Sequence, residues 1–258
     1  MKVAVIQMQA RDNFSQNVDR AEAFIHQAAQ KKCQFVLLPE VFVYRGKYPD
    51  SKGYHSLAER VPGPLSRRLG EAAKRHNIFL LAGSIFEKGG DPKRVFNTSL
   101  LINPLGEVQA KYRKRNLFHA QVGSRHIRES DFFLSGHRRA VTKVNGFHLG
   151  MSICYDLRFP ELYQFYSRRG ADVLTVPSAF TLSTGKAHWE CLLRARAIEN
   201  LAYVLAPNQP GKDAKGIRTF GSSMIIDPWG KVLAKASIDK EEIICAQLSA
   251  KVLQVARK

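Results

Sequence analysis

The stretch Phe147-His-Leu-Gly-Met-Ser-Ile-Cys154 is an apolar run that ends at a cysteine, and Tyr-Asp-Leu-Arg-Phe-Pro-Glu161 follows at once. This pattern predicts a buried strand that turns into a helix at the cysteine. A thiol at such a turn lies at the edge of a sheet, and the N–H groups that follow it point toward whatever the sulfur attacks. The alternative is a small buried side chain, because free cysteine is among the most buried residue types.

The chain repeats one pattern of a strand, an amphipathic helix and a second strand. The pattern covers residues 3–6, 17–30 and 35–38, and again residues 149–153, 161–169 and 172–176. Each second strand follows a basic pair and ends near a proline. A βαβ unit of this kind places functional residues at the carboxyl ends of its strands. We therefore expect Glu40, just past the first unit, and Cys154 to meet on one rim.

The segments between and after these units add further elements. A helix is predicted to start at Gly63-Pro64 and to run to about residue 75, and strands are predicted at residues 78–85 and 97–102. Turn chemistry predicts a turn at Lys88-Gly-Gly-Asp-Pro92 and hairpin tips at Leu105-Gly106 and Trp229-Gly230. Periodicity alone therefore supports a mixed α/β fold.

Glu40 follows the short apolar strand Phe35-Val-Leu-Leu38 and Pro39. A charged side chain directly after a buried strand lowers the stability of the fold unless it is paired or has a catalytic task. Glu40 is therefore a candidate catalytic carboxylate. The alternatives are an acid at the start of a helix and a surface loop residue. The basic run Lys111-Tyr-Arg-Lys-Arg-Asn-Leu-Phe118 is typical, taken alone, of a solvated charged loop.

Three separated blocks of the chain carry a family resemblance. They are Leu37-Leu-Pro-Glu40, Tyr112-Arg-Lys-Arg-Asn-Leu-Phe118 and Ser152-Ile-Cys-Tyr-Asp-Leu-Arg-Phe-Pro-Glu161. Together they resemble the signature blocks of the nitrilase superfamily of carbon–nitrogen hydrolases, and they occur in the same order. The resemblance covers most of the chain and continues through residues 176–180, 185–190, 192–199 and 227–230.

The resemblance implies a four-layer αββα sandwich, in which two sheets pack face to face. It gives the roles of a catalytic triad to Glu40, Lys114 and Cys154, and it matches Glu129 with a second glutamate that many members carry. The residues alone do not select Lys114 over its basic neighbours. Glu129 would orient Lys114 or the substrate, and its alternative is an ordinary ion pair with a neighbouring arginine.

Amide hydrolysis explains why these residue types are needed. An amide is a poor electrophile with a poor leaving group, so the site must supply a strong nucleophile, a proton relay and stabilisation of charge on the oxygen. By the resemblance, Cys154 would form a thioester, and Glu40 would relay the proton and later activate water. Lys114 and the backbone N–H of Tyr155 would hold the oxyanion. The alternative from another functional class is a binding protein that catalyses no reaction, and the complete triad argues against this alternative.

Length and composition bound the architecture. A chain of 258 residues with 45% apolar content can bury one substantial core, and we expect a single carbon–nitrogen hydrolase domain over residues 1–258. No stretch is long and apolar enough to cross a membrane, and the amino terminus is interpreted as a first strand rather than as a secretory segment. Four widely separated cysteines without a Cys-x-x-Cys pair suggest neither a disulfide framework nor a zinc ribbon. A reducing, cytoplasmic compartment follows.

The formal net charge of +18 is spread over scattered basic pairs rather than gathered in a tail or a recognition motif. We therefore expect no specific nucleic-acid binding and favour attraction of anionic substrates. The histidines lie in separate segments without the His-x-x-x-His spacing of a zinc hydrolase, so we expect no metal and no cofactor. His188 is expected to orient the loop at the rim of the site, with substrate contact as the alternative.

The motif variants also indicate a branch of the superfamily. Residues 156–160, 177–180 and 192–199 look closest to the Nit1-like group, whose members act as amidases on deaminated glutathione. The interpretation is an amidase that hydrolyses a small carboxylate-bearing amide and releases ammonia. Omega-amidases acting on α-ketoglutaramate are the near alternative, and other aliphatic or carbamoyl amide hydrolases stand behind them.

Arg158, Ser178 and Phe180 are the candidate substrate-binding residues. Arg158 lies four residues past Cys154 and can reach a substrate carboxylate if the turn continues into a helix. Its alternative is a bidentate ion pair that holds the turn. The resemblance also implies a homodimer or a higher homo-oligomer.

Overall fold

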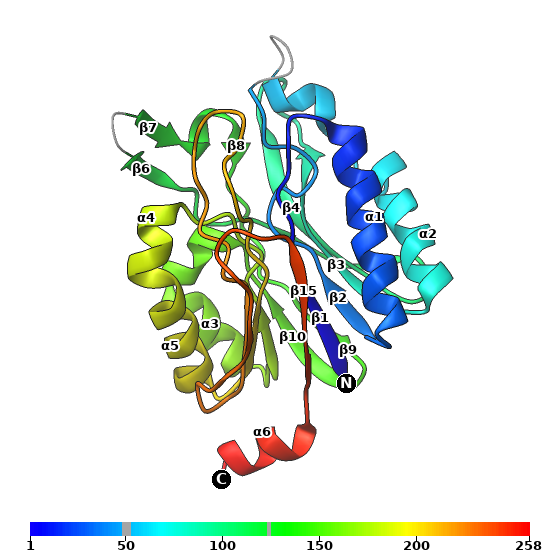
Figure 1. Cartoon of the computed structure of the whole chain (residues 1–258), viewed down its shortest axis with the longest axis vertical. Helices are drawn as coiled ribbons and strands as arrows, with labels where there is room; N and C mark the ends of the chain where they lie inside the picture. The colour runs from blue at the N-terminus through cyan, green and yellow to red at the C-terminus, as the bar shows by residue number, and fades with distance from the viewer. Residues whose placement is uncertain (48–52, 123–124) are drawn as a thin grey trace.

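The computed structural model describes residues 1–47, 53–122 and 125–258, and these ranges form two large sheets packed face to face (Figure 1). Helices cover the outer face of each sheet, so the order of layers is helix, sheet, sheet, helix. This is the αββα sandwich that the family resemblance implies.

The first sheet has the strand order β15-β1-β2-β3-β4-β5, and β8 pairs with β4. Its outer face is covered by α1 (Phe14–Gln30) and α2 (Pro64–His76), as Figure 1 shows. The strands are β1 (Lys2–Gln7), β2 (Phe35–Leu37), β3 (Phe79–Lys88), β4 (Val95–Ile102), β5 (Val108–Arg113), β8 (Phe133–Leu134) and β15 (Glu242–Gln247).

The second sheet has the strand order β14-β13-β12-β11-β10-β9. Its strands are β9 (Val141–Val144), β10 (Phe147–Met151), β11 (Val173–Thr175), β12 (Tyr203–Ala206), β13 (Met224–Ile226) and β14 (Val232–Lys235). The helices on this side are α3 (Pro160–Ser167), α4 (Leu182–Thr184) and α5 (Glu190–Asn200), with a hairpin of β6 (His119–Val122) and β7 (Arg125–Arg128) at one end. The helix α6 (Ala250–Ala256) follows β15.

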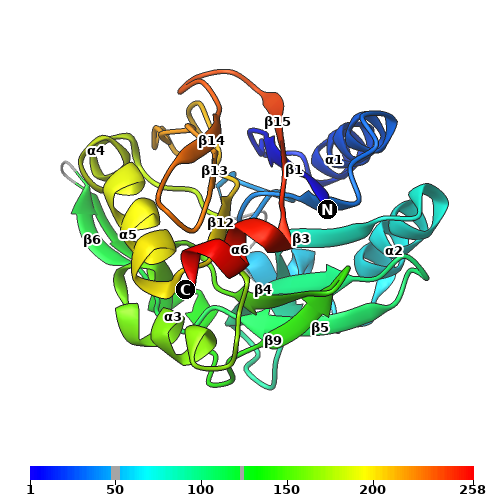
Figure 2. The same cartoon turned by 90° about the horizontal axis from the view of Figure 1, so that it is seen from below.

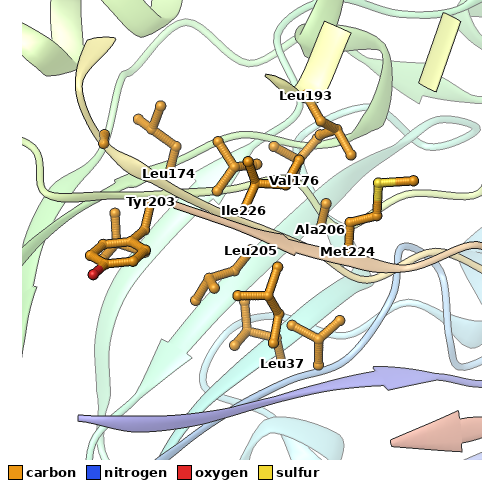
Figure 3. Packing of buried hydrophobic residues seen from close by; sticks show 14 of the residues in the cluster. Leu37, Leu174, Val176, Leu193, Tyr203, Leu205, Ala206, Met224 and Ile226 are labelled. Carbon is orange, nitrogen blue, oxygen red and sulfur yellow. The ribbon is translucent and has the colours of Figure 1, made fainter. Parts of the chain in front are cut away.

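Alternation along β1 shows how the layers are specified. Val3 and Val5 belong to the core shared with the second sheet, whereas Ala4 and Ile6 belong to the core beneath α1. Successive side chains of a strand point to opposite faces, and both faces are buried here, so the strand is a continuous apolar run. Figure 3 shows Leu37 of β2 beside Leu205 of β12 in the core between the sheets.

The helix ends follow from local chemistry. Asn13 caps α1 because its side chain accepts a hydrogen bond from the N–H of Gln16 at 3.0 Å, so the helix begins at Phe14, earlier than the predicted residue 17. In α2, Pro64 stands at the start, and Asn77 ends the helix in the left-handed conformation with φ +50°. The predicted bounds of α2 are confirmed within a residue.

Both predicted strand–helix–strand units are confirmed. β1 and β2 pair in parallel across α1, and β10 and β11 pair in parallel across α3. The carboxyl ends of β2 and β10 lead directly to Glu40 and Cys154. Within the described ranges, no helix has the length and apolar character that a membrane span requires.

Candidate active site

Cys154 stands at the sharp turn that follows β10. It is the first residue of a 3-10 helix, Cys154–Arg158, and its φ is +48°. A left-handed conformation costs a residue other than glycine roughly 1–3 kcal/mol, and such strain persists where the surroundings hold it. Here the N–H of Cys154 donates to the carbonyl of Pro177 at 2.9 Å. The sequence prediction of a cysteine at a strand-to-helix turn is confirmed.

Asp156 holds this turn from inside the protein. It is fully buried and accepts hydrogen bonds from the N–H of Ile153 at 3.0 Å, the hydroxyl of Tyr112 at 2.7 Å and the backbone and side-chain nitrogens of Asn116 at 2.9 and 2.8 Å. Burial raises the pKa of Asp156, and these hydrogen bonds oppose the rise. One carboxyl group thus ties the cysteine turn to β5 and to the segment that follows it.

Glu40 lies just past β2 and is 3% exposed. Its Oε1 accepts a hydrogen bond from Asn97 Nδ2 at 2.9 Å, and its backbone carbonyl accepts one from Gln209 Nε2 at 2.5 Å. The next residue, Val41, has φ +48°, which is rare for a β-branched residue, and its N–H donates to Ser84 Oγ at 2.8 Å. The carboxylate is therefore fixed from both its side chain and its backbone.

Gly83 of β3 gives the chain room to place Glu40. A Cβ at this position would lie 2.0 Å from the carbonyl oxygen of Pro39 and 2.3 Å from that of Leu38. The strand β3 also shifts its register against β4 between Ala82 and Ile85. Only glycine allows the backbone of β3 to approach the end of β2 this closely.

The basic side chains that begin in β5 point to two different sides of the sheet. Lys111 Nζ and Arg113 Nε pair with Glu87 at 2.5 and 2.8 Å. Lys114 is fully buried on the other side, where Nζ donates to Glu40 Oε1 and Glu129 Oε1, both at 2.9 Å. The geometry singles out Lys114 as the member of the run that meets Glu40.

Glu129 opens a 3-10 helix, Glu129–Asp131, after β7. Besides its pair with Lys114, its Oε2 accepts a hydrogen bond from the N–H of Phe118 at 2.8 Å. Its ion pair is thus with Lys114 rather than with a neighbouring arginine. Of its two expected roles, this geometry corresponds to the one that orients Lys114.

Burial and charge set the protonation of this group. Burial opposes the charge on Lys114, yet the carboxylates of Glu129 and Glu40 raise its pKa well above the ordinary value. Burial, partly offset by Lys114, raises the pKa of Glu129. Burial and the charge of Glu40 raise the pKa of Cys154 well above the ordinary value. The sulfur of the free protein is therefore a neutral thiol that needs a base when it attacks.

A cavity of about 360 Å³ opens onto these side chains. Glu40, Glu129 and Cys154 all line it, which agrees with the expectation that Glu40 and Cys154 share one rim. Aromatic residues form much of the remaining wall, namely Tyr44, Tyr54, Phe118, Phe132, Phe133, Tyr155 and Phe180. A small molecule in this space would contact the thiol, a carboxylate and an apolar surface together.

Arg158 lines the cavity beside the cysteine turn. Its guanidinium lies 5.7 Å from the ring centres of both Tyr155 and Phe180, and its Nη2 lies 3.1 Å from His188 Nδ1. Among the residues that the structure describes, no carboxylate pairs with Arg158. The alternative of an ion pair that holds the turn is therefore not found, and His188 contacts the arginine at the rim.

The other two predicted substrate-binding residues differ in position. Phe180 lines the cavity and packs on Trp189 with ring centres 4.7 Å apart. Ser178 is fully buried, its hydroxyl donates to the carbonyl of Val176 at 3.0 Å, and it is not among the cavity residues. The substrate contact expected of Ser178 stays a prediction, and in this structure its hydroxyl is engaged with the backbone next to its own strand end.

The cavity wall also carries a second group of cationic side chains, which no sequence pattern predicts. Arg45 Nη2 pairs with Asp213 Oδ2 at 3.0 Å, and Lys215 Nζ donates to the hydroxyl of Tyr54 at 2.9 Å. Arg45, Asp213 and Lys215 come from loops without a recognisable motif, and only the fold brings them together. Over the described parts of the chain, no group of three or more His, Cys, Asp and Glu side chains is arranged to hold a metal ion.

Comparisons with known proteins identify the family of this chain. A family model described as carbon-nitrogen hydrolase matches residues 2–258. The chain is 38% identical to omega-amidase NIT2 of Homo sapiens over 260 residues, which cover 100% of this chain and 91% of that protein. It is 39% identical to the deaminated glutathione amidase of Synechocystis sp. (strain PCC 6803 / GT-S) over 259 residues, which cover 99% of this chain and 94% of that protein.

The fold has a solved counterpart as well. The crystal structure of Nit3 from Saccharomyces cerevisiae, a member of branch 10 of the nitrilase superfamily, superposes with a TM-score of 0.87 and 32% sequence identity. The match covers 100% of this chain and 93% of that one. The likeness therefore extends over the whole sandwich and is not limited to the site.

Proposed function

The chain belongs to the carbon–nitrogen hydrolase family, and we propose that it is an amidase acting on a small amide that carries a carboxylate, with Cys154 as the nucleophile. One observation carries the proposal. A strained, cavity-lining Cys154 faces the same space as Glu40, whose carboxylate is bonded to the buried Lys114. Residues 1–258 act in this proposal as one hydrolase domain.

In the first half of the reaction, the carboxylate of Glu40 takes the proton of the Cys154 thiol as the sulfur attacks the amide carbonyl. The negative charge that forms on the carbonyl oxygen is held by Lys114 and by the N–H of Tyr155. Collapse of this intermediate breaks the C–N bond, and Glu40 gives the proton to the departing nitrogen. The product is a thioester on Cys154.

In the second half, Glu40 removes a proton from water as the water attacks the thioester. The same donors hold the second oxyanion, and its collapse releases the acid and returns the proton to the sulfur. Glu129 keeps the ammonium of Lys114 in place through both halves, because Lys114 is bonded to Glu129 as well as to Glu40. Glu129 is thus a positioning residue in this mechanism.

The two candidate substrates share the acyl half. Deaminated glutathione and α-ketoglutaramate both carry a keto acid whose far carboxyl is the amide, so both would leave the same acyl group on Cys154. They differ in the leaving group, which is ammonia for α-ketoglutaramate and the amine of a dipeptide for deaminated glutathione. The expected release of ammonia therefore applies only to the alternative substrate.

Charge on the cavity wall favours deaminated glutathione. Arg158 lies at the cysteine turn, whereas Arg45 and Lys215 contact Asp213 and Tyr54 on loops outside that turn. Deaminated glutathione carries a second carboxylate on its dipeptide, and α-ketoglutaramate does not. We assign Arg158 to the carboxylate that both substrates share, and the Arg45 and Lys215 group to the one that only the longer substrate has.

Omega-amidase activity on α-ketoglutaramate stays the second candidate, because a relative of comparable identity carries that name. The experiment is to incubate the protein with each substrate separately and to measure the common keto acid product. A larger kcat/KM for deaminated glutathione supports the first candidate, and a larger value for α-ketoglutaramate supports the second. No keto acid from either substrate would contradict both assignments.

We also propose that the protein is located in a reducing, cytoplasmic compartment. A separate proposal is that it forms a homodimer or a higher oligomer. The apolar side chains of Val252 and Val255 on α6 are 39% and 65% exposed, and partner burial would remove them from water. Size-exclusion chromatography coupled to light scattering measures the oligomeric state. A monomer at micromolar concentration would contradict it.

A further inference from the structure

Two cysteines that lie far apart in the sequence meet beside α1. Cys33 lies in the turn between α1 and β2, and Cys245 lies on β15. Their sulfur atoms are 3.6 Å apart, and the contact joins positions 212 residues apart in the chain. Figure 2 shows β15 beside β1, on the side of the molecule where α1 lies. Sheet topology, not sequence spacing, creates the pair.

The two side chains share one layer of the core. Cys33 is 3% exposed and belongs to the core beneath α1, and Cys245 packs against this core as a partly exposed residue. Cys245 pairs with Ala4 in the antiparallel register of β15 and β1. A disulfide has an S–S length of about 2 Å, so the sulfurs need to close by only about 1.5 Å. β15 is the edge strand of its sheet and has one strand neighbour to constrain it.

Exposure makes the two sulfurs different, because Cys33 is buried and Cys245 is partly exposed. The hydrogen bond between the two sulfurs, in which either can donate, lowers the pKa of Cys245 to about 6, and the charges of Lys2 and Lys31 lower the pKa of both thiols. The same hydrogen bond, together with burial, raises the pKa of Cys33. Lys2 Nζ donates to the carbonyl of Lys31 at 2.6 Å, which keeps its ammonium at this turn. The two sulfurs therefore share one readily lost proton, and the partly exposed Cys245 is the one that a small oxidant reaches first.

We propose that Cys33 and Cys245 are a peroxide-sensitive thiol pair that oxidises to an intramolecular disulfide between β15 and the turn after α1. The oxidant is hydrogen peroxide. The Cys245 thiolate attacks one peroxide oxygen, the O–O bond breaks, and the hydroxide that leaves takes a proton from solvent to give water. Cys245 is then a sulfenic acid.

The second step closes the pair. Cys33 attacks the sulfur of the sulfenic acid, the S–O bond breaks, and the leaving hydroxide takes the Cys33 proton to form a second water. The two sulfurs lose two electrons in all, and these reduce the peroxide. The reaction needs no group from the catalytic cavity, because neither Cys33 nor Cys245 lines it.

The other cysteines serve as internal comparisons. Cys154 is buried and has a pKa raised well above the ordinary value, so its neutral thiol reacts slowly with peroxide. Cys191 on α5 is exposed, and its side chain has no second cysteine in hydrogen-bond contact among the described residues. We expect Cys245 to react first and the disulfide to form before either Cys154 or Cys191 is oxidised.

The test treats the purified full chain with about one equivalent of hydrogen peroxide and maps its peptides without reduction. The expected product is a Cys33–Cys245 cross-linked peptide in the wild type and in Cys191→Ser. In Cys33→Ser, the cross-link is absent and dimedone traps a sulfenic acid on Cys245. In Cys245→Ser, both products are absent. Amidase activity close to wild type shows that each variant is folded, because neither residue belongs to the catalytic group.

A second readout follows stability. The disulfide restrains the unfolded chain, so the oxidised wild type should melt about 5–10 °C higher than the reduced form, and Cys33→Ser should show no such rise. The proposal is overturned if Cys154 or Cys191 oxidises while Cys33 and Cys245 stay reduced. It is also overturned if dimedone labels Cys245 no faster than Cys191 in Cys33→Ser.

Discussion

Lys114 Nζ donates to Glu40 Oε1 and to Glu129 Oε1 at 2.9 Å each, so one fully buried ammonium joins two carboxylates behind the cavity. A buried ion pair contributes little net stability, but removal of one partner leaves the other charge uncompensated. Lys114 therefore has two tasks. It balances the carboxylates in the folded protein, and it stabilises the oxyanion during the reaction.

Lys114→Ala tests both tasks. Loss of a preorganised oxyanion donor lowers kcat by about 100-fold to 1,000-fold. The variant also leaves Glu40 and Glu129 without their buried cation, which costs about 3–5 kcal/mol of stability. Steady-state kinetics and denaturant unfolding measure the two effects separately.

Lys111→Ala is the matched control within the same basic run. Lys111 is partly exposed and pairs with Glu87, which Arg113 also contacts. We therefore expect kcat within a few-fold of the wild type and a small loss of stability. If Lys111→Ala reduced kcat as much as Lys114→Ala does, the assignment of Lys114 would be wrong.

Gly83→Ala tests how the fold places the base. The added Cβ would lie 2.0 Å from the carbonyl oxygen of Pro39, so the backbone before Glu40 must move. A displacement of about an ångström at a catalytic group lowers kcat by roughly 10-fold to 100-fold. Gly90→Ala is the control, since its Cβ would meet nothing within 4 Å. Equal kcat for the two variants would contradict this account of Gly83.

The ionisation of Cys154 is testable by titration. Because burial and Glu40 raise its pKa above the ordinary value of 9.0, the thiol should stay protonated at neutral pH. The difference in ultraviolet thiolate absorbance between wild type and Cys154→Ala should be absent near pH 7 and should grow only above pH 9.0. A difference signal already complete at pH 7 would mean a preformed thiolate and would remove the need for Glu40 as the base.

Arg158 and Lys215 should affect the two substrates differently. Arg158→Lys keeps the charge but loses the planar fork, so KM should rise for both deaminated glutathione and α-ketoglutaramate with a smaller change in kcat. Lys215→Met should raise KM for deaminated glutathione alone. A fall in melting temperature with unchanged KM in Arg158→Lys would instead give Arg158 a structural role.

The local patterns in the sequence predict much of this structure. The apolar runs before Glu40 and Cys154, the start of α2 at Pro64 and the hairpin tip at Trp229-Gly230 depend on residues close together in the chain. Such features follow from strand periodicity, capping and turn chemistry. They also place Glu40 and Cys154 at strand ends, which is why their common rim is predictable.

The partners of these residues depend on long-range geometry. Asp156 anchors the cysteine turn through Tyr112 and Asn116, and the sequence shows only an acid in a turn. Ser178 follows a strand end as Glu40 does, yet its hydroxyl is turned to its own backbone. Cys33 and Cys245 meet because β15 returns to pair with β1, which no local pattern specifies.

The most direct test of the account is to map the covalent intermediate. We mix the wild-type protein with each substrate, stop the reaction with acid before steady state, and locate the added mass by peptide analysis. We predict one acyl adduct on Cys154, of the same mass from deaminated glutathione and from α-ketoglutaramate, and none in Cys154→Ala. Turnover without any adduct on Cys154, or an adduct on another cysteine, would contradict the proposed nucleophile.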